Sequence, residues 1–295
     1  MIELDEQQQH AVQTNSERAL VIAGAGSGKT RVLTERIAFL IEHRKVSPHE
    51  IMAFSFTRKA SGEIRSRLET RLGAQARNVT MGTMHGIALG MIHRFGEQIG
   101  LKPRNVTVYS QWESDYLLKE IAIEMGIFKK AWNPKKGDID KLFADYYERG
   151  KYPDEDGGRA ADLFYTFIAR CRENNALTYG ALLVALELLI PTMSKYLNTR
   201  HILIDEIQDI DPLQWRIIWA MCEAFGASLF CVGDVDQSIY EFRGAVPGYL
   251  VAHEQLFDVF RIETNYRSNP GIVDAANRLI SYNQDRISKT MRANR

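Results

Sequence analysis

The residues with the plainest chemical purpose in this sequence form the run AGAGSGKT at positions 23–30. Its three glycines carry no Cβ atom, so the backbone N–H groups around them can approach phosphate oxygens closely. Lys29 is placed to reach the β- and γ-phosphates of a nucleotide, and the Thr30 hydroxyl to hold Mg²⁺. A plain tight turn is the simpler explanation of a glycine-rich stretch. GKT between an apolar run and an amphipathic segment nevertheless favours a phosphate-binding loop.

Two adjacent acids, Asp205 and Glu206, end the apolar run HILIDE. Removing carboxylates from water is costly unless something uses them. In a protein with a phosphate-binding loop, the first such acid holds Mg²⁺ and the next can orient or deprotonate the attacking water. Further along, Gln237 in GDVDQ could sense a γ-phosphate or a water molecule, and Arg267 could stabilise charge in the transition state.

Aromatic and basic side chains follow two further predicted strands. Phe56, Thr57 and Arg58 lie at the carboxyl end of one of them, which is where ligands bind in open α/β sheets. Phe242 could stack on a base while the neighbouring Arg243 grips a phosphate. A phenylalanine that only fills the core explains Phe242 equally well, and both explanations stay open at this point.

Short apolar runs occur where strands are needed to position these side chains. Predicted parallel strands cover residues 20–23, 51–56, 79–83, 201–206, 228–232 and 260–264. Amphipathic helices are predicted between them, including one at 31–43 and one that begins near Pro270. The second is predicted to turn Ile272, Val273, Ala276 and Ile280 inward. This alternation predicts an α/β fold with a mainly parallel sheet.

A short helix is also predicted before the first strand, at residues 4–12, opened by Asp5. Gln8 within it is explained as a solvated residue or as a reader of adenine, because an amide offers both a donor and an acceptor.

The pattern changes between residues 101 and 192, where strands disappear and amphipathic helices follow one another. Residues 138–149 have apolar side chains at i, i+3, i+4, i+7 and i+8, and a last helix is predicted to end before Pro191. We expect a helical insertion with no chemistry of its own. The polar and basic residues 281–295 are expected to contain no further strand.

The composition limits the class of protein. Lys+Arg and Asp+Glu both number 37, so the net charge argues neither for nor against nucleic acid, and any basic surface must be local. Cys171, Cys222 and Cys231 lack paired metal-ligand spacing and are expected as buried free thiols of a reducing compartment. Residues 1–9 are polar and acidic, so we expect no signal peptide, and the apolar run at 181–190 is too short to span a bilayer. We expect a soluble intracellular protein.

Taken together, these stretches resemble a known family. The sequence contains, in order and at about the expected spacing, LDEQQQHAV, AGAGSGKT, FSFTRKAS, GTMHGIAL, LIDEIQDID, VGDVDQSIYEFRGA and ETNYRSNPGIVDAAN. This series is similar to that of UvrD/Rep/PcrA-type superfamily 1 DNA helicases and runs from Leu4 to about Lys289. Seven stretches in register are very specific, whereas any single one would not be.

The resemblance implies a RecA-like P-loop NTPase core with a mainly parallel sheet, interrupted by an all-helical insertion. The core would comprise residues 1–100 and 193–280, the insertion residues 101–192, and residues 281–295 would start a second core. It further implies an enzyme that uses ATP and Mg²⁺ to translocate 3′ to 5′ on single-stranded DNA, with single/double-strand junctions as partners. Such an enzyme would act in the cytoplasm, at the nucleoid or in a phage-infected cell.

The resemblance also assigns roles to residues. Gln8 would read adenine and Tyr266 would stack on the base. The implied nucleotide contacts are Gln8, Ala23, Gly24, Ala25, Gly26, Ser27, Gly28, Lys29, Thr30, Arg31, Tyr266 and Arg267. The implied catalytic residues are Lys29, Asp205, Glu206, Gln237 and Arg267, with Thr30 and Asp205 on the metal. The implied single-strand contacts are Phe56, Thr57, Arg58, Thr83, His85, Phe242 and Arg243.

The sequence departs from the family pattern in places. Ala23 stands where the general phosphate-loop pattern has glycine, as in the helicase version of the loop. Relatives usually have an aromatic residue at Ile207 and tryptophan at Phe242, and phenylalanine keeps a face for stacking. Relatives continue into a second RecA-like core, which we expect to begin where this sequence ends, at Arg295. Translocation needs two such cores, which close and open around ATP.

That last departure leaves other functions to consider. One is a module that binds DNA or a protein partner under nucleotide control, without unwinding. Another is a metabolic phosphate-loop kinase, which does not explain Phe56, Phe242 or the GDVDQ loop. Measuring ATPase activity with and without single-stranded DNA distinguishes the motor from the binding module.

Overall fold

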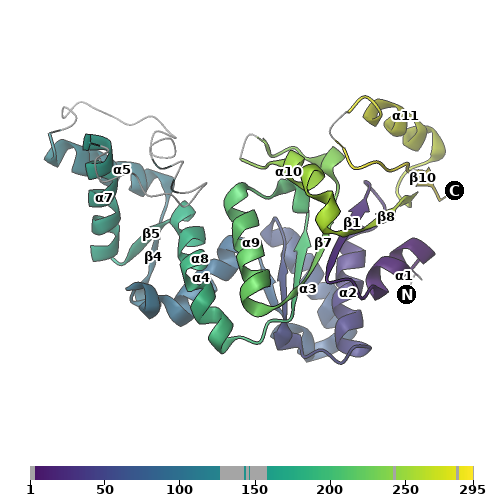
Figure 1. The fold of residues 1–295 in the computed structure, drawn as a ribbon, viewed down its shortest axis with the longest axis horizontal. Helices are drawn as coiled ribbons and strands as arrows, with labels where there is room; N and C mark the ends of the chain where they lie inside the picture. The colour runs from purple at the N-terminus through teal and green to yellow at the C-terminus, as the bar shows by residue number, and fades with distance from the viewer. Residues whose placement is uncertain are drawn as a thin grey trace. The chain divides into compact units, whose positions relative to one another are not determined.

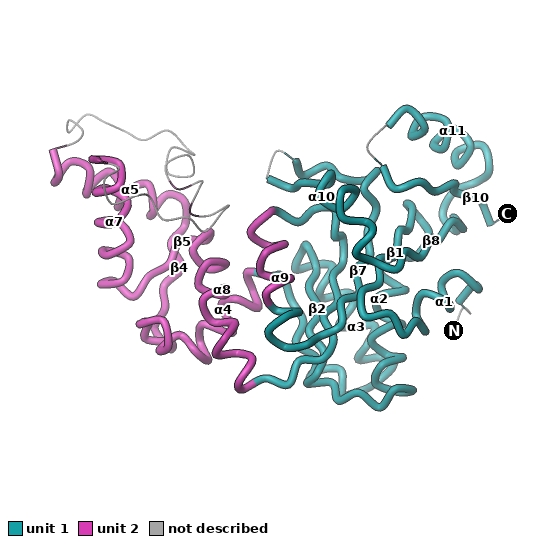
Figure 2. Tube along the Cα trace, in the orientation of Figure 1, with its two compact units in different colours: residues 1–84, 197–211, 221–295 teal, residues 85–196, 212–220 magenta. Residues whose placement is uncertain are grey.

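The computed structural model describes residues 4–126, 143, 146, 158–241, 244–283 and 286–294. The chain divides into two units, coloured separately in Figure 2. The first contains Met1–Met84, Leu197–Asp211 and Met221–Arg295, and the second contains His85–Tyr196 and Pro212–Ala220. Each unit is therefore built from segments that are distant in the sequence.

The first unit is organised around a six-stranded sheet, part of which is labelled in Figure 1, in which all strands are parallel. In spatial order the strands are β3 (Thr80–Gly82), β2 (Ile51–Phe54), β6 (His201–Asp205), β7 (Ser228–Gly233), β1 (Arg18–Ala23) and β8 (Asp258–Ile262). The inner strands are apolar and largely buried, as expected for a parallel sheet covered on both faces. The predicted α/β fold with a mainly parallel sheet is confirmed.

The register of the strands brings their carboxyl ends to one edge. Ala23 at the end of β1 lies opposite Ile262, and Gly233 at the end of β7 lies opposite Ile22. Asp205, the last residue of β6, lies opposite Val232. The segments that follow β1, β6 and β7 therefore start side by side.

The first unit also contains helices. They are α1 (Glu6–Gln13), α2 (Lys29–Glu42), α3 (Arg58–Leu72), α10 (Pro247–Ala252) and α11 (Pro270–Ile280), with the end of α9 (Pro212–Phe225). Short 3₁₀ turns in this unit are Pro48–Glu50, Gly73–Asn78, Ile207–Asp209, Val235–Gln237 and Glu254–Leu256. Leu33 and Ile37 of α2 and Leu68 of α3 are fully buried, in one cluster with Val21 of β1 and Leu203 of β6. This cluster holds the helices that follow β1 and β2 against the sheet.

The second unit is mainly helical. Its elements are the residues of α4 (Met84–Phe95) from His85 onward, α5 (Gln111–Glu124), α7 (Gly158–Glu173), α8 (Tyr179–Tyr196), the start of α9, and 3₁₀ turns at Gly96–Ile99 and Pro103–Asn105. Phe143 is buried against Phe164 and Phe167, with ring centroids 4.8 and 5.1 Å apart. Most of the helix predicted at residues 138–149 lies outside the described residues.

Two predictions for this segment were wrong. The insertion is not all-helical, because β4 (Thr107–Tyr109) and β5 (Ala176–Thr178) form a small parallel sheet. Three-residue strands are too short to produce a periodic pattern in the sequence. The last helix does not end before Pro191 but continues through it to Tyr196. A proline removes one helical hydrogen bond, but the helix can continue when the next turn is packed against the rest of the unit. Here buried Met193 provides that packing.

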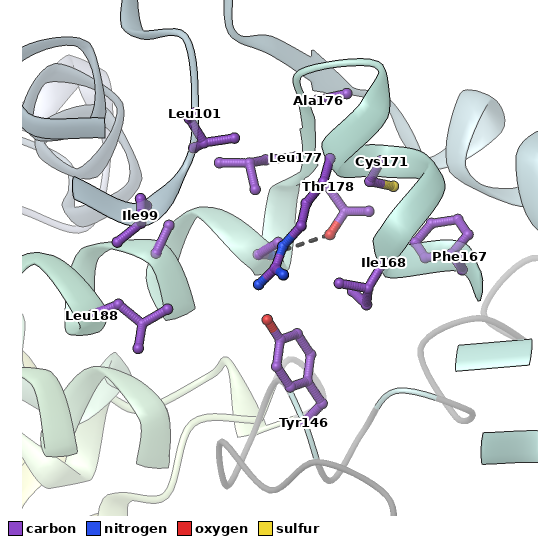
Figure 3. A pocket seen from close by; sticks show the side chains of 13 residues that line it. Ile99, Leu101, Tyr146, Phe167, Ile168, Cys171, Ala176, Leu177, Thr178 and Leu188 are labelled. Carbon is purple, nitrogen blue, oxygen red and sulfur yellow. Dashed lines mark hydrogen bonds between the residues drawn. The ribbon is translucent and has the colours of Figure 1, made fainter. Parts of the chain in front are cut away.

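A small pocket lies within the second unit, lined mainly by apolar side chains such as Leu101, Phe167 and Leu177 (Figure 3). Its volume of about 50 Å³ is far below the several hundred Å³ of a typical ligand pocket. Cys171 on its wall is buried, and burial raises the pKa of its thiol to about 12. A thiol that stays protonated is a poor nucleophile.

The C-terminal part of the first unit also differs from expectation. Strand β10 (Arg292–Ala293) pairs in parallel with β9 (Thr264–Asn265), although no strand was predicted after residue 281. In α11, Val273 is buried as predicted and Ile280 is half-buried, but Ala276 is exposed and Ile272 is 57% exposed. An apolar stripe shows which face of a helix can be buried. The described residues cover only part of the apolar face of α11.

Two further predictions concern cysteines and membranes. Cys171 and Cys231 are buried free thiols as predicted, whereas Cys222 is only partly buried. In the part of the chain that the structure describes, no helix has the length and apolar character needed to cross a membrane.

At the carboxyl edge of the sheet, there is little room for a side chain larger than that of Gly233. A Cβ atom there would lie 2.6 Å from Ile207 Cγ2, 3.1 Å from the Ile207 nitrogen, and closer still to Gln208 Oε1. We predict that Gly233→Ala lowers the free energy of unfolding by about 1–3 kcal/mol through overpacking, measured by urea denaturation.

Gly62→Ala is the matched control for this substitution. Gly62 lies inside α3, and a Cβ atom added there would meet nothing within 4 Å, so alanine should stabilise the helix by about 0.5–1 kcal/mol. A Gly233→Ala protein as stable as its parent would contradict the close packing described above.

Candidate active site

The predicted phosphate-binding loop joins β1 to α2 in the first unit. Gly26 and Gly28 have φ angles of 74° and 90°, a region that side chains with a Cβ rarely adopt. The Ser27 hydroxyl is buried and donates to the Gly24 carbonyl at 2.7 Å. The loop is thus held in a tight curve that ends at the first turn of α2, where helix N–H groups are free to meet an anion.

Close neighbours also explain why these positions are glycines. A Cβ on Gly26 would lie 2.6 Å from Cβ of Arg267, and one on Gly28 would lie 3.1 Å from Nε2 of Gln8. A Cβ on Gly24 would collide with the Met291 side chain. The approach of phosphate, which the sequence suggested, is therefore only part of the reason, because protein atoms also pack against the other side of the loop.

Gln8 is one of those neighbours. Its side chain is 1% exposed, and its Nε2 donates to the Ser27 carbonyl at 2.8 Å. Asp5 begins α1 as predicted, and its carboxylate accepts from the Gln8 backbone N–H at 2.7 Å. Burial against the loop excludes the solvated explanation of Gln8.

The segment after β9 closes the other side of the loop. Asn265 is buried, and its Nδ2 donates to the Ala25 carbonyl at 2.7 Å. Its Oδ1 accepts from the backbone N–H groups of Arg267 at 2.9 Å and Ser268 at 2.7 Å. Asn265 is not among the site residues predicted from the sequence, although an asparagine that opens a turn before a proline-started helix is a usable signal.

Tyr266 extends this closure toward α1. Its backbone N–H donates to the Gly26 carbonyl at 3.0 Å, and its hydroxyl donates to Asp5 Oδ2 at 2.5 Å. The residue is 44% exposed. Tyr266 and Gln8 therefore flank the phosphate loop from two different segments.

Two acids stand at the carboxyl end of β6. Asp205 is 3% exposed, and among the described residues its Oδ1 atom has no hydrogen-bond partner. Glu206 has left-handed backbone angles, with φ 52° and ψ 52°, and accepts from Gln208 Nε2 at 2.9 Å through Oε2. The turn after β6 therefore separates the two carboxylates, one buried and one facing the loop.

Burial changes the acidity of this end of the sheet. Desolvation, assisted by the charge of Glu206, raises the pKa of Asp205 to about 7. The same two causes raise the pKa of Asp209 to about 6. Lys29 opposes both shifts through its positive charge.

Lys29 meets side chains from two other strand ends. Its Nζ donates to Gln237 Oε1 at 2.7 Å and lies 3.9 Å from Glu206 Oε2. Gln237 in turn donates through Nε2 to Asp234 Oδ2. The lysine side chain is 10% exposed, so its charge depends on these polar neighbours.

Several of these residues border one cleft of about 440 Å³, whereas Gln8, Asp205 and Tyr266 do not line it. Its lining consists of Gly24, Ala25, Gly26, Gly28, Lys29, Thr30, Arg31, Glu63, Arg67, Glu206, Gln237 and Arg267. The cleft brings together most of the side chains predicted for the nucleotide. Glu63 and Arg67 of α3 form an ion pair and were missed, because their helix was explained as a solvated charged face.

The predicted single-strand contacts are only partly brought together. In the first unit the rings of Phe56 and Tyr240 lie 4.5 Å apart at 37°. The Thr57 hydroxyl accepts from the Ala60 N–H at 3.1 Å and begins α3, and Arg58 is exposed next to it. Tyr240 was not among the predicted site residues, because the local sequence QSIYEF does not indicate that its ring contacts the ring of Phe56.

Other predicted contacts lie elsewhere. Thr83 lies near the end of the first unit's first segment, whereas His85 belongs to the second unit and stacks on Tyr179 with centroids 3.9 Å apart. Burial lowers the pKa of His85 to about 4, so its ring is neutral at pH 7. Phe242 and Arg243 lie outside the described residues.

Comparison with known proteins gives a consistent family. The family model described as UvrD/REP helicase N-terminal domain matches residues 4–258. The ATP-dependent DNA helicase PcrA of Staphylococcus epidermidis is 32% identical over 97% of this chain and 41% of its own length. The protein of the same name from Staphylococcus aureus is 31% identical over the same shares. The chain thus spans about two fifths of the length of these relatives.

Among solved structures, the Pif1 helicase from Candida albicans matches with a TM-score of 0.44 and 14% identity, covering 95% of this chain and 44% of that one. Nothing about function follows from a likeness at that level.

The raised pKa of Asp205 makes stability depend on pH when nucleotide and metal are absent. Between pH 5 and 8 the folded chain loses a proton from Asp205 that the unfolded chain has already lost, so the free energy of unfolding falls as pH rises. Asp205→Asn removes this loss. We compare the free energy of unfolding of the variant with that of its parent at each pH. From pH 5 to pH 8 this difference should shift in favour of the variant by roughly 1 to 3 kcal/mol, measured by urea denaturation at both pH values.

Asp274→Asn, at an exposed position of α11, serves as the control and should keep a constant difference from the parent. A constant difference for Asp205→Asn as well would show that Asp205 ionises in the fold as it does in the unfolded chain.

Proposed function

This chain belongs to the UvrD/REP helicase family, and we propose that it binds and hydrolyses ATP with Mg²⁺ as the first motor core of a DNA helicase. One observation carries the proposal. Lys29 from the phosphate loop, Glu206 and Gln237 from two strand ends, and Arg267 from the segment after β9 border one polar cleft. These are the groups that hydrolysis of a phosphate anhydride requires, gathered from four separate parts of the sequence.

The cleft is built to receive the phosphates. The loop before α2 presents backbone N–H groups and the positive end of the helix dipole. Lys29 would exchange its contact with Gln237 for phosphate oxygens, and exposed Arg267 would add positive charge from the other side. Because Gln237 lies 2.7 Å from Lys29 before nucleotide binds, it is placed to contact the terminal phosphate afterwards.

Asp205 and Thr30 suit a divalent cation. The buried Oδ1 of Asp205 has no partner among the described residues, and a buried carboxylate oxygen is stable when a cation accepts its charge. Oxygen ligands of this kind, with nucleotide phosphates and water, are those that Mg²⁺ takes. When bound, the metal would neutralise charge on the phosphates.

Glu206 is the proposed base. Its carboxylate is 32% exposed, so water can reach it, and Gln208 fixes one of its oxygens at 2.9 Å. The left-handed backbone at Glu206 turns its side chain away from the course of β6 and toward Lys29. It would accept a proton from the water that attacks the terminal phosphate.

The adenine is proposed to lie near Tyr266 and Gln8. The tyrosine ring is partly exposed, and its hydroxyl is held by Asp5, which leaves a face available for stacking. Gln8 is held by the loop and by the start of α1. Its amide would exchange one of these hydrogen bonds for the edge of the base.

The proposed DNA contacts follow the strand ends on the other side of β6. Phe56 and Tyr240 would present aromatic faces to bases, and Thr57 and Arg58 would meet phosphates. Thr83, His85, Phe242 and Arg243 remain predicted contacts. We propose single-stranded DNA and its junctions with duplex as partners, 3′ to 5′ movement, and the cytoplasm as the place of action.

Removing the lysine or the base should separate binding from hydrolysis. We predict that Lys29→Ala weakens ATP binding at least tenfold, because it removes a charged contact to phosphate. Glu206→Gln should keep ATP affinity within about threefold and lower the turnover at least a hundredfold. Both are measured by calorimetry and by steady-state ATPase assays with and without single-stranded DNA, with exposed Glu97→Gln as the control.

Unchanged turnover in Glu206→Gln would exclude it as the base. DNA-stimulated turnover of the parent chain supports the motor. Binding of ATP and DNA without turnover supports instead a binding module under nucleotide control.

The aromatic pair gives a separate test of DNA contact. Phe56→Ala should weaken binding of an oligothymidine by about 1–3 kcal/mol, and we expect the same for Phe242→Ala if a base stacks on each ring. Fluorescence anisotropy measures both. Phe95→Ala is the matched control, because Phe95 also stacks on an exposed tyrosine, Tyr196, in the second unit. If Phe56→Ala and Phe95→Ala both weaken DNA binding by the same small amount, Phe56 is not a DNA contact.

A further inference from the structure

The last described residues of the chain are attached to the active site. We call residues 286–294 the terminal segment. Its strand β10 pairs with β9, and Asn277 of α11 exchanges two hydrogen bonds with the Met291 backbone, at 2.8 and 3.1 Å. Met291 packs its side chain against Gly24 of the phosphate loop. Figure 1 shows α11 and β10 next to each other beside β8.

The terminal segment also carries a buried lysine. Lys289 is 9% exposed, and its Nζ donates to Asp236 Oδ2 at 2.6 Å and to Asp234 Oδ1. Arg286 pairs with Asp236 at 3.1 Å. A lone buried ammonium group would be strongly unfavourable, and here two carboxylates and two cations balance one another.

Asp234 connects this cluster to the cleft by two routes. Through its side chain it accepts from Gln237 Nε2, and Gln237 Oε1 accepts from Lys29 at 2.7 Å. Through its backbone N–H it donates to Gln208 Oε1 at 2.9 Å, and Gln208 Nε2 donates to Glu206 at 2.9 Å. Asp234 thus contacts both amides that touch the proposed hydrolytic groups.

The chemistry of these partners allows one orientation of each amide. A carboxylate only accepts and an ammonium group only donates, so Gln237 must turn Nε2 to Asp234 and Oε1 to Lys29. Gln208 must likewise turn Oε1 to the Asp234 N–H. A displaced Asp234 would release this constraint on Gln237, which then could present either end to a phosphate.

We propose that Lys289 is a positioning residue for the nucleotide site. By holding the Asp234 carboxylate in place, it keeps the amide of Gln237 in the orientation that reads the terminal phosphate. The inference rests on the proposed function, since it concerns the same site. It adds that the terminal segment, which contributes no residue to the lining of the cleft, sets how strongly the site distinguishes a nucleoside triphosphate from a diphosphate.

The test compares two nucleotides on the full chain. The affinities of Mg²⁺-ADP and of Mg²⁺ with a non-hydrolysable ATP analogue are measured by calorimetry for the parent, Lys289→Met, Lys289→Arg and Lys195→Met. Lys289→Met should bind the ATP analogue about tenfold more weakly, the effect of one misplaced hydrogen bond to a charged group, while its ADP affinity stays within about twofold. Lys289→Arg should retain most of the parent's preference for the ATP analogue. Lys195→Met, on the exposed end of α8, should match the parent.

A double variant shows whether Lys289 acts through Gln237. If it does, Lys289→Met should change the affinity of the ATP analogue less than about twofold when Gln237→Ala is already present. Should Lys289→Met unfold, Lys289→Met with Asp236→Asn removes one charge of each sign and takes its place in the comparison.

The outcomes separate the two proposals. Equal losses for both nucleotides, or a full Lys289→Met effect in the Gln237→Ala background, would overturn the positioning role and leave the proposed function standing. A parent chain that binds neither nucleotide would overturn the proposed function, and the positioning role with it. Binding by the parent that is lost in Lys29→Ala, with a selective loss in Lys289→Met, supports both.

Discussion

Charge that has been taken out of water is the constraint on which this site depends. Asp205, Asp234, Lys29 and Lys289 are all nearly buried, and each would be unfavourable without opposite charge or a hydrogen bond nearby. The protein satisfies them by gathering the ends of β1, β6 and β7 at one edge of the sheet, so that acids from two strands face cations from a loop and from the terminal segment. Of these four residues, Asp205 keeps an oxygen without a partner in the described part of the chain, and that oxygen is where we place the metal.

The parallel sheet makes this gathering possible. Parallel strands all end at the same edge, so residues 24–30, 206–209 and 234–237 become neighbours although some 200 positions separate the first from the last. Helices α2 and α3 supply the buried face that holds the strands in register. The resulting cleft is lined by the phosphate loop, by Glu206 and Gln237 from two strand ends, and by Arg267.

Much of this could be read from the sequence, for identifiable reasons. The strands of the central sheet are mostly apolar, and several are followed by a residue type with an evident use, as with Asp205 after HILI or Lys29 after the glycines. The parts that escaped prediction depend on contacts between distant residues. Asn265 donates to the phosphate loop, the ring of Tyr240 contacts that of Phe56, and Lys289 forms an ion pair with Asp234. No local sequence pattern indicates these contacts. Ile272 escaped for the opposite reason, because a helical stripe indicates which face is apolar but not whether anything covers it.

The backbone at Glu206 has a consequence for how such proteins change over evolutionary time. A glutamate held at φ 52° is in a conformation that glycine adopts freely and that costs other residues on the order of 1–3 kcal/mol. Random substitution at this position therefore meets opposed pressures: glycine would relax the turn, yet it would remove the carboxylate beside Lys29. If Glu206 is the base that we propose, a lineage that no longer needed hydrolysis would be expected to drift toward glycine or asparagine here. The identity of residue 206 in a homologue would then indicate whether that homologue keeps the proposed base.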